Sequence, residues 1–192
     1  MKPITFDSIK AMYAKRGYKF YENGAFNLNI WAIRSGYETV NLHDDILGVC
    51  YYDEFGRPIC LAFGGTTKPG LYYLKNKLGN PNGTAILCEG YHKDAFRYGH
   101  HRGYPALIQN RQLPVYRDYN KDGKFDVNGK VYRDVTGLNL HTDDTPDFVG
   151  GSSAGCQNIV PRTEFEIFMA VVRRSLDYFP NRFSYALFEN CE

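Results

Sequence analysis

The feature that most constrains the fold is a pair of apolar runs within residues 45–63, separated by the turn sequence at residues 53–58. Two short apolar runs around a turn that contains Gly and Pro are typical of a β-hairpin. Further strands are predicted at residues 26–33, 85–89, 113–116 and 131–135, where apolar residues alternate or form short runs. The chain is therefore expected to be rich in β-structure.

An amphipathic helix is predicted near each end of the chain, at residues 5–16 and at residues 163–179. In the second helix, Thr163 and Glu166 have the spacing of a capping box, and Pro180 would stop the helix. Five apolar residues would form its buried face: Phe165, Phe168, Met169, Val172 and Leu176.

The length indicates a single domain over residues 1–192, because a chain of 192 residues can bury a core of its own. The expected fold class is α+β and mostly β, a curved mixed sheet or sandwich with the N-terminal and C-terminal helices packed outside. A formal charge of +2 predicts no attraction to nucleic acid or membrane. We expect a monomer.

The five cysteines indicate neither a zinc site nor a fully paired disulfide set, because they are odd in number, scattered and without a C-x-x-C pair. Cys50, Cys60 and Cys88 lie in apolar, strand-like runs and are expected to be small buried side chains. Cys191 lies at the C-terminus. Only Cys156 has a polar, glycine-rich setting.

Cys156 and His141, which fourteen residues separate, have the composition of a thiol nucleophile and its base. An imidazole can take the thiol proton, so we expect a depressed pKa and rapid alkylation of Cys156 at pH 6 to 7. Gly155 would allow a tight turn and leave amides free for an oxyanion. His141 could be oriented by Asp143, by Asp144 or by a backbone carbonyl.

The segment around Cys156 resembles the catalytic signature of the L,D-transpeptidase (YkuD-like) family, of which this chain would be a divergent, phage- or secretion-associated member. Five residues match that pattern: His141, Ser153, Gly155, Cys156 and Asn158. Ala154 stands where the family usually has histidine. Residues 64–73 are similar to the family's Thr-Pro-x-Gly-x-aromatic entry into a strand. The resemblance covers about residues 45–160.

The resemblance implies the family's fold and a cysteine-dependent peptidoglycan enzyme, a transpeptidase or an L,D-carboxypeptidase or endopeptidase. It implies Cys156 as nucleophile and His141 as base, with Ser153 and Gly155 completing the catalytic segment. Asn158, Ala154 and His101 would lie on the substrate side, and no metal or other cofactor would be required. Peptidoglycan stem peptides would form a thioester that an amine or water resolves.

Such an enzyme would act on the cell wall or in the periplasm, yet no signal peptide is visible at the N-terminus. Phage lysis, an injection apparatus or a leader that this sequence lacks would have to deliver it. The alternative function is a non-catalytic cell-wall-binding or virion structural protein on the same scaffold. The departure at Ala154 and the surplus of Tyr favour this alternative.

Two further segments have alternative interpretations. Residues 92–109 carry a histidine pair, His100 and His101, in a predicted loop that would lie either on the surface or beside a substrate cleft. A second segment resembles the first half of a calcium loop, with oxygen side chains at Asp118, Asn120, Asp122 and Asp126. Gly129 occupies the position of the bidentate Glu, so an Asx-rich turn is favoured over bound calcium.

Overall fold

The computed structural model describes residues 3–76, 80–143 and 147–189. Within these ranges the chain forms three helices and eleven strands. The helices are α1 (Phe6–Lys15), α2 (Leu71–Lys75) and α3 (Arg162–Ser175). The strands are β1 (Asn29–Arg34), β2 (Asp45–Tyr52), β3 (Pro58–Thr66), β4 (Thr84–Leu87), β5 (Gly90–His101), β6 (Tyr104–Gln109), β7 (Leu113–Asp118), β8 (Tyr132–Asp134), β9 (Leu140–Thr142), β10 (Gln157–Ile159) and β11 (Phe183–Glu189).

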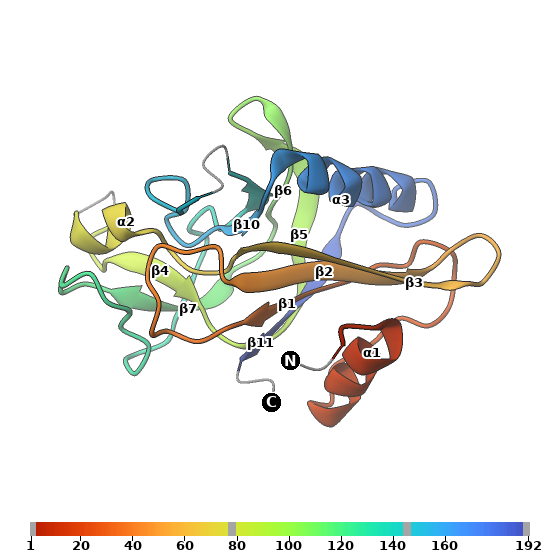
Figure 1. Cartoon of the computed structure of the whole chain (residues 1–192), viewed down its shortest axis with the longest axis horizontal. Coiled ribbons are helices and arrows are strands. Elements are labelled where there is room, and N and C mark those ends of the chain that lie inside the picture. The colour runs from red at the N-terminus through yellow and green to blue at the C-terminus, as the bar shows by residue number, and fades with distance from the viewer. Residues whose placement is uncertain (1–2, 77–79, 144–146, 190–192) are drawn as a thin grey trace.

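Eight strands close into a barrel, in the order β1-β11-β5-β6-β9-β10-β3-β2, and a separate three-stranded sheet has the order β4-β7-β8 (Figure 1). The barrel is mixed, because β1 pairs with β11 and β9 with β10 in parallel, whereas its other pairs are antiparallel. The mostly β architecture is confirmed, and its main sheet closes on itself instead of forming an open sandwich.

The strands predicted from short apolar runs are confirmed, with small shifts at their ends. The β2–β3 hairpin pairs from Tyr52↔Pro58 to Asp45↔Gly65, so it extends beyond the predicted residue 63. The predicted strand at residues 26–33 begins only at Asn29. Phe26 has a φ of 56°, a left-handed conformation that does not continue a strand.

Helices α1 and α3 pack against two separate apolar clusters. Side chains from all parts of the barrel, from the small sheet and from α3 form the larger cluster, which includes Ile30, Leu47, Leu140 and Phe168. Helix α1 covers the other face of β1, β2 and β11, around Trp31. In Figure 1 the two helices accordingly lie on opposite sides of the β1–β2–β3 region. Thus α1 covers the outer face of the barrel, as predicted. Helix α3 packs against the apolar cluster that the inward-facing side chains of the barrel form.

The predicted capping of the C-terminal helix is wrong. Pro161 is its N-cap residue and no side chain caps it, so Thr163 already lies within the helix and forms no capping box with Glu166. The helix ends at Ser175, four residues before the predicted end and well before Pro180. Its predicted apolar face is confirmed by the burial of Phe165, Phe168, Met169 and Val172, with Leu176 partly buried.

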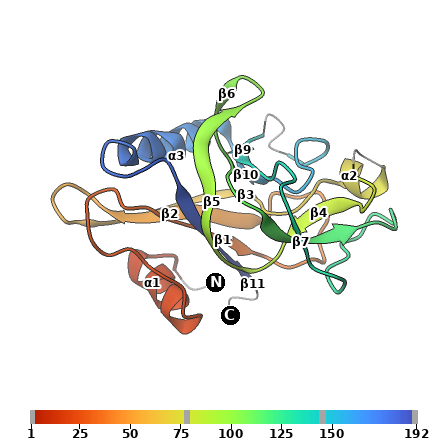
Figure 2. The ribbon, with the colours of Figure 1, turned by 180° about the vertical axis from the view of Figure 1, so that it is seen from behind.

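Two predicted segments have a different secondary structure. Residues 71–75 form the short helix α2, not the entry to a strand. Residues 92–109 are not a loop, because β5 and β6 form a hairpin with His101 opposite Tyr104. The two connecting residues, Arg102 and Gly103, have φ angles of 47° and 88°, as a two-residue hairpin turn requires. Figure 2 shows this hairpin extending above the rest of the barrel.

The burial of Cys50 and Cys88 is confirmed, whereas Cys60 is only partly buried. Cys191 lies outside the described residues, as do parts of the predicted turn at residues 77–84. None of the helices in the described ranges is long and apolar enough to span a membrane.

Candidate functional site

The parallel pairing of β9 with β10 brings His141 and Cys156 to the same edge of the barrel. Asn158 of β10 lies opposite His141 of β9, and Cys156 directly precedes β10. The Asn139 N–H donates to Cys156 Sγ at 3.4 Å. Because alternate residues of an extended chain share a face, Asn139 and His141 point to the same side. By the same alternation Cys156 shares a face with Asn158, the partner of His141, so the thiol and the imidazole lie on one face of this strand pair. The Cys156 thiol itself donates to the Gly137 carbonyl at 3.5 Å.

His141 is held so that one nitrogen is free to act as a base. Its Nδ1–H donates to the Thr142 carbonyl at 2.6 Å, and the Tyr104 hydroxyl lies 3.3 Å from the same nitrogen. The proton on Nδ1 leaves the lone pair on Nε2. Nε2 is buried and has no hydrogen-bond partner among the residues that the structure describes. This nitrogen is the candidate proton acceptor.

A backbone carbonyl therefore orients His141, one of the three groups considered from the sequence. Asp143 instead contacts His43 Nε2 at 3.3 Å and accepts a hydrogen bond from the Ser152 hydroxyl. Asp144 lies outside the described residues.

His101 and Asn139 complete the cluster. The His101 ring stacks on His141, with 4.4 Å between ring centroids and 20° between planes. Asn139 Nδ2 lies 3.0 Å from His101 Nδ1, and Asn139 Oδ1 accepts the Gln109 N–H at 3.0 Å. Asn139 thus links His101, Cys156 and β6. The sequence analysis missed this residue, although the alternation of residues 138–141 placed it on the face of His141.

Burial, not charge, controls ionisation at this site. Burial lowers the pKa of His141 to about 4, with opposing contributions from the Thr142 carbonyl and Asp143. Burial also raises the pKa of Cys156, despite the Asn139 N–H and the positive charge of Arg102. The expected depressed pKa of Cys156 is therefore wrong. Near neutral pH the resting site holds a thiol and a neutral imidazole.

The turn before Cys156 is built from backbone contacts. The Ser153 hydroxyl lies 2.9 Å from the Cys156 carbonyl and accepts the Gly155 N–H at 3.1 Å. Ser153 is fully buried, so its hydroxyl holds the turn and does not face a substrate. The Gly155 amide is already engaged, contrary to its expected role as an oxyanion donor. The Cys156 amide remains the candidate donor.

Gly155 is required by this turn for two reasons. Its φ is +113°, and a Cβ there would lie 2.2 Å from the Ala85 carbonyl oxygen. No larger residue fits such a contact without movement of β4 or of the turn.

The predicted substrate-side residues occupy different environments. Ala154 is exposed at the tip of the turn. Asn158 is fully buried and its Nδ2 donates to Ser152 Oγ at 3.2 Å. Its Oδ1 has no hydrogen-bond partner within the described part of the chain. His101 stacks on His141, and Asn158 lies opposite His141 in the β9–β10 pair.

The loop after β7 folds as an Asx-rich turn. Asn120 Oδ1 accepts the Asp122 N–H at 2.9 Å, and Asp122 Oδ1 accepts the Lys124 N–H at 2.8 Å. Asp118 Oδ2 lies 3.3 Å from the Asp126 N. Across residues 3–76, 80–143 and 147–189, no group of three or more His, Cys, Asp or Glu side chains is placed to hold a metal ion. These side chains cap their own loop, as expected of an Asx-rich turn.

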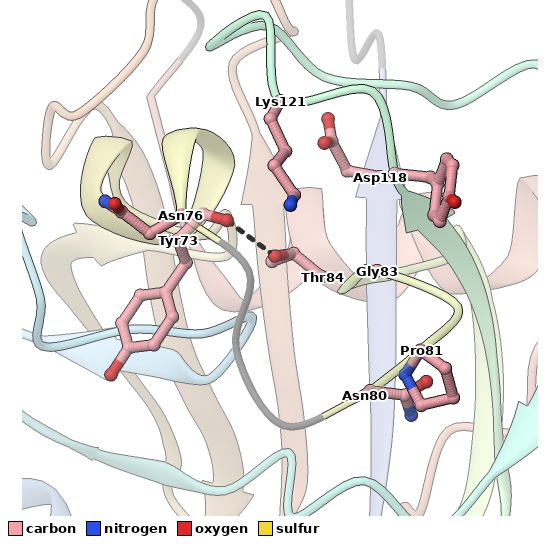
Figure 3. Close-up of a pocket in the computed structure, with 9 residues that line it drawn as sticks. Tyr73, Asn76, Asn80, Pro81, Gly83, Thr84, Asp118 and Lys121 are labelled. Carbon is pink, nitrogen blue, oxygen red and sulfur yellow. Dashed lines mark hydrogen bonds between the residues drawn. The ribbon is translucent and has the colours of Figure 1, made fainter.

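A small cavity of about 50 Å³ lies beside this loop, between α2 and the β4–β7 pair (Figure 3). The Thr84 hydroxyl donates to the Tyr73 carbonyl at 2.7 Å across one side of it. The residues that line it are Tyr73, Asn76, Asn80, Pro81, Gly83, Thr84, Asp118, Tyr119 and Lys121. None of them belongs to the His141–Cys156 cluster.

None of the protein-family models, curated proteins or solved structures compared with this chain matches it. The chemistry of the site must therefore be inferred from its own residues.

The free energy of unfolding is expected to fall as the pH decreases from about 6.5 to 4. Burial lowers the pKa of both His92 and His141 to about 4. Between these pH values the unfolded chain binds protons that the folded chain does not, so acid favours unfolding. The loss is up to about 3 kcal/mol per histidine. It can be measured by urea unfolding at pH 7 and pH 4.5.

Variants separate this effect from the titration of carboxylates. His92→Gln and His141→Gln should each reduce the pH dependence, whereas His100→Gln, at an exposed position, should leave it unchanged. An equal pH dependence in all four proteins would contradict the assignment.

Proposed function

We propose that this protein is a cysteine-dependent enzyme that cleaves or exchanges peptide bonds in peptidoglycan stem peptides, as L,D-transpeptidases do. The observation that carries the proposal is the buried Nε2 of His141, which has no hydrogen-bond partner in the described chain and lies on the same face of the β9–β10 pair as Cys156. A buried base nitrogen without a partner in the described chain costs free energy of folding, and a catalytic role is one explanation for retaining it. The resemblance of residues 141–158 to the family's signature supports the choice of substrate.

The reaction begins from the neutral pair. His141 Nε2 takes the Cys156 thiol proton as the sulfur attacks the peptide carbonyl carbon, so ionisation accompanies attack and no resting thiolate is needed. The Cys156 N–H stabilises the oxyanion. His141 then gives the proton to the leaving amine, and a thioester remains on Cys156. An amine resolves it in transpeptidation and water in hydrolysis.

The position of Arg102 supports the proposal that the substrate carries carboxylates. It lies exposed at the tip of the β5–β6 hairpin, directly after His101. Its positive charge contributes to the lowered pKa of His101 and His141 and opposes the rise in the pKa of Cys156, so its field reaches the whole cluster. A cation at this rim would attract the carboxylates of a stem peptide.

The alternative is a non-catalytic wall-binding or virion structural protein. Two observations favour it: the pKa of the Cys156 thiol is raised by burial, and Ala154 stands exposed where the family has histidine. Such a protein would bind cell-wall material and leave it chemically unchanged.

The test is incubation of the protein with purified tetrapeptide muropeptides, followed by mass analysis of products and protein. The enzyme should release shortened or exchanged stem peptides and carry a transient acyl adduct on Cys156. Unchanged muropeptides, no adduct and co-sedimentation with insoluble peptidoglycan would instead establish the alternative.

A further inference from the structure

Two cysteines outside the proposed site face each other across the β2–β3 hairpin. Cys50 of β2 is directly opposite Cys60 of β3. Directly opposite residues in an antiparallel pair place their side chains on the same face. Both thiols lie in the cluster that α1 covers, on the opposite face from the core cluster that contains Leu140 of β9.

The hydrogen bonds of the hairpin show which kind of pair this is. The Cys50 carbonyl accepts a hydrogen bond from the Asn29 side chain of β1 at 3.3 Å, so it points away from β3. Three residues later, the Asp53 N–H donates to the Arg57 carbonyl at 3.0 Å, toward the β3 side. Backbone groups alternate in direction along a strand, so Cys50 and Cys60 form a non-hydrogen-bonded pair.

This pairing suits a disulfide. Non-hydrogen-bonded partners have Cα atoms about 4.5 Å apart. Disulfides form when this distance lies between about 4.4 and 6.8 Å. The Cβ atoms of such a pair are also closer than those of a hydrogen-bonded pair.

The two sulfurs differ in access. Cys50 is fully buried, whereas Cys60 is partly exposed. The Cys50 thiol donates a hydrogen bond that lowers the pKa of Cys60, and the Cys60 sulfur in turn raises the pKa of Cys50. Cys60 is thus the sulfur that an external reagent reaches first. Cys50 lies opposite it and can attack a mixed disulfide formed at Cys60.

We propose that Cys50 and Cys60 are a reactive dithiol that closes into a cross-strand disulfide by exchange with a low-molecular-weight disulfide. The Cys60 thiolate attacks the external disulfide, forms a mixed disulfide and releases one thiol. The Cys50 thiolate then attacks the Cys60 sulfur and releases the second thiol. One external disulfide is reduced to two thiols, and the protein loses two hydrogen atoms.

The closed form would link the two strands of the longest hairpin in the barrel. At its far end β3 pairs with β10, through Thr66 and Asn158, so this hairpin also supports the strand that follows Cys156. A cross-link reduces the freedom of the unfolded chain and so raises the unfolding temperature. Closure itself is independent of the chemistry proposed at Cys156.

The experiment incubates the folded protein with oxidised glutathione at pH 8, then unfolds it in denaturant with excess iodoacetamide, which blocks every free thiol, and measures the intact mass. We expect two fewer alkylated thiols, no retained glutathione, a peptide map that joins the segments containing Cys50 and Cys60, and an unfolding temperature higher by several degrees. Dithiothreitol should restore the two thiols, separate the joined peptides and lower the unfolding temperature again.

Cysteine variants identify the two sulfurs. Cys60→Ser should form no disulfide, so all of its remaining cysteines should be alkylated. Cys50→Ser should retain glutathione on Cys60. Cys88→Ser should form the Cys50–Cys60 disulfide as the wild type does. A stable glutathione adduct on wild-type Cys60, full alkylation of all five cysteines, or a disulfide between any other pair would overturn the proposal.

Discussion

Cys156→Ser is expected to lower the rate of stem-peptide cleavage or exchange by about 10⁴-fold or more while leaving the fold intact. A serine hydroxyl is a far weaker nucleophile with the same base, because His141, whose pKa burial lowers to about 4, is a weak proton acceptor. Serine is nearly isosteric, and its oxygen can still accept the Asn139 N–H. The rate is measured by mass analysis of released peptides, and the fold by thermal unfolding.

Cys88→Ser is the matched control for this variant. Cys88 and Cys156 are each 8% exposed, so both substitutions place a hydroxyl at a similarly buried position. Cys88→Ser should retain wild-type activity within a few-fold. If Cys156→Ser were as active as this control, Cys156 would not be the nucleophile and the proposed mechanism would be wrong.

Gly155→Ala is expected to destabilise the protein by about 3 kcal/mol or more and to remove activity in the folded fraction. The new Cβ would lie 2.2 Å from the Ala85 carbonyl oxygen, and alanine would have to adopt a φ of +113°. Relief of this contact requires movement of the turn that carries Cys156. Urea unfolding measures the free energy, and the peptide assay measures the activity.

Gly129→Ala provides the comparison. A Cβ at Gly129 meets no atom within 4 Å, and its φ is not in the left-handed region. This variant should differ from the wild type by less than about 0.5 kcal/mol. Equal unfolding midpoints for the two variants would show that the turn tolerates a Cβ at residue 155.

The parts of the fold that could be predicted are those that local pattern determines. The hairpin at residues 45–63 was predictable because its turn and its two apolar runs are adjacent in sequence. The closure of the barrel was not, because it depends on parallel pairing between strands far apart in sequence, such as β1 with β11. Such partners leave no local signature in a single sequence.

The candidate site shows the same division. His141 and Cys156 could be singled out because residue type limits which side chains act as base and nucleophile. The stacking of His101 on His141 depends on the β5–β6 turn, whose Arg-Gly pair was not recognised as a hairpin signal. The raised pKa of Cys156 could not be predicted either, because burial is a property of the assembled tertiary structure.

The pairing of β6 with β9 is the shortest in the barrel and lies beside the candidate site. These two strands pair at a single position, Leu107↔Leu140, and β9 and β10 are only three residues long. Short ladders open locally at a lower free energy than the whole domain. A buried thiol beside so short a ladder can become accessible to a large substrate through local fraying, while the long β2–β3 and β5–β6 hairpins keep the rest of the ring closed.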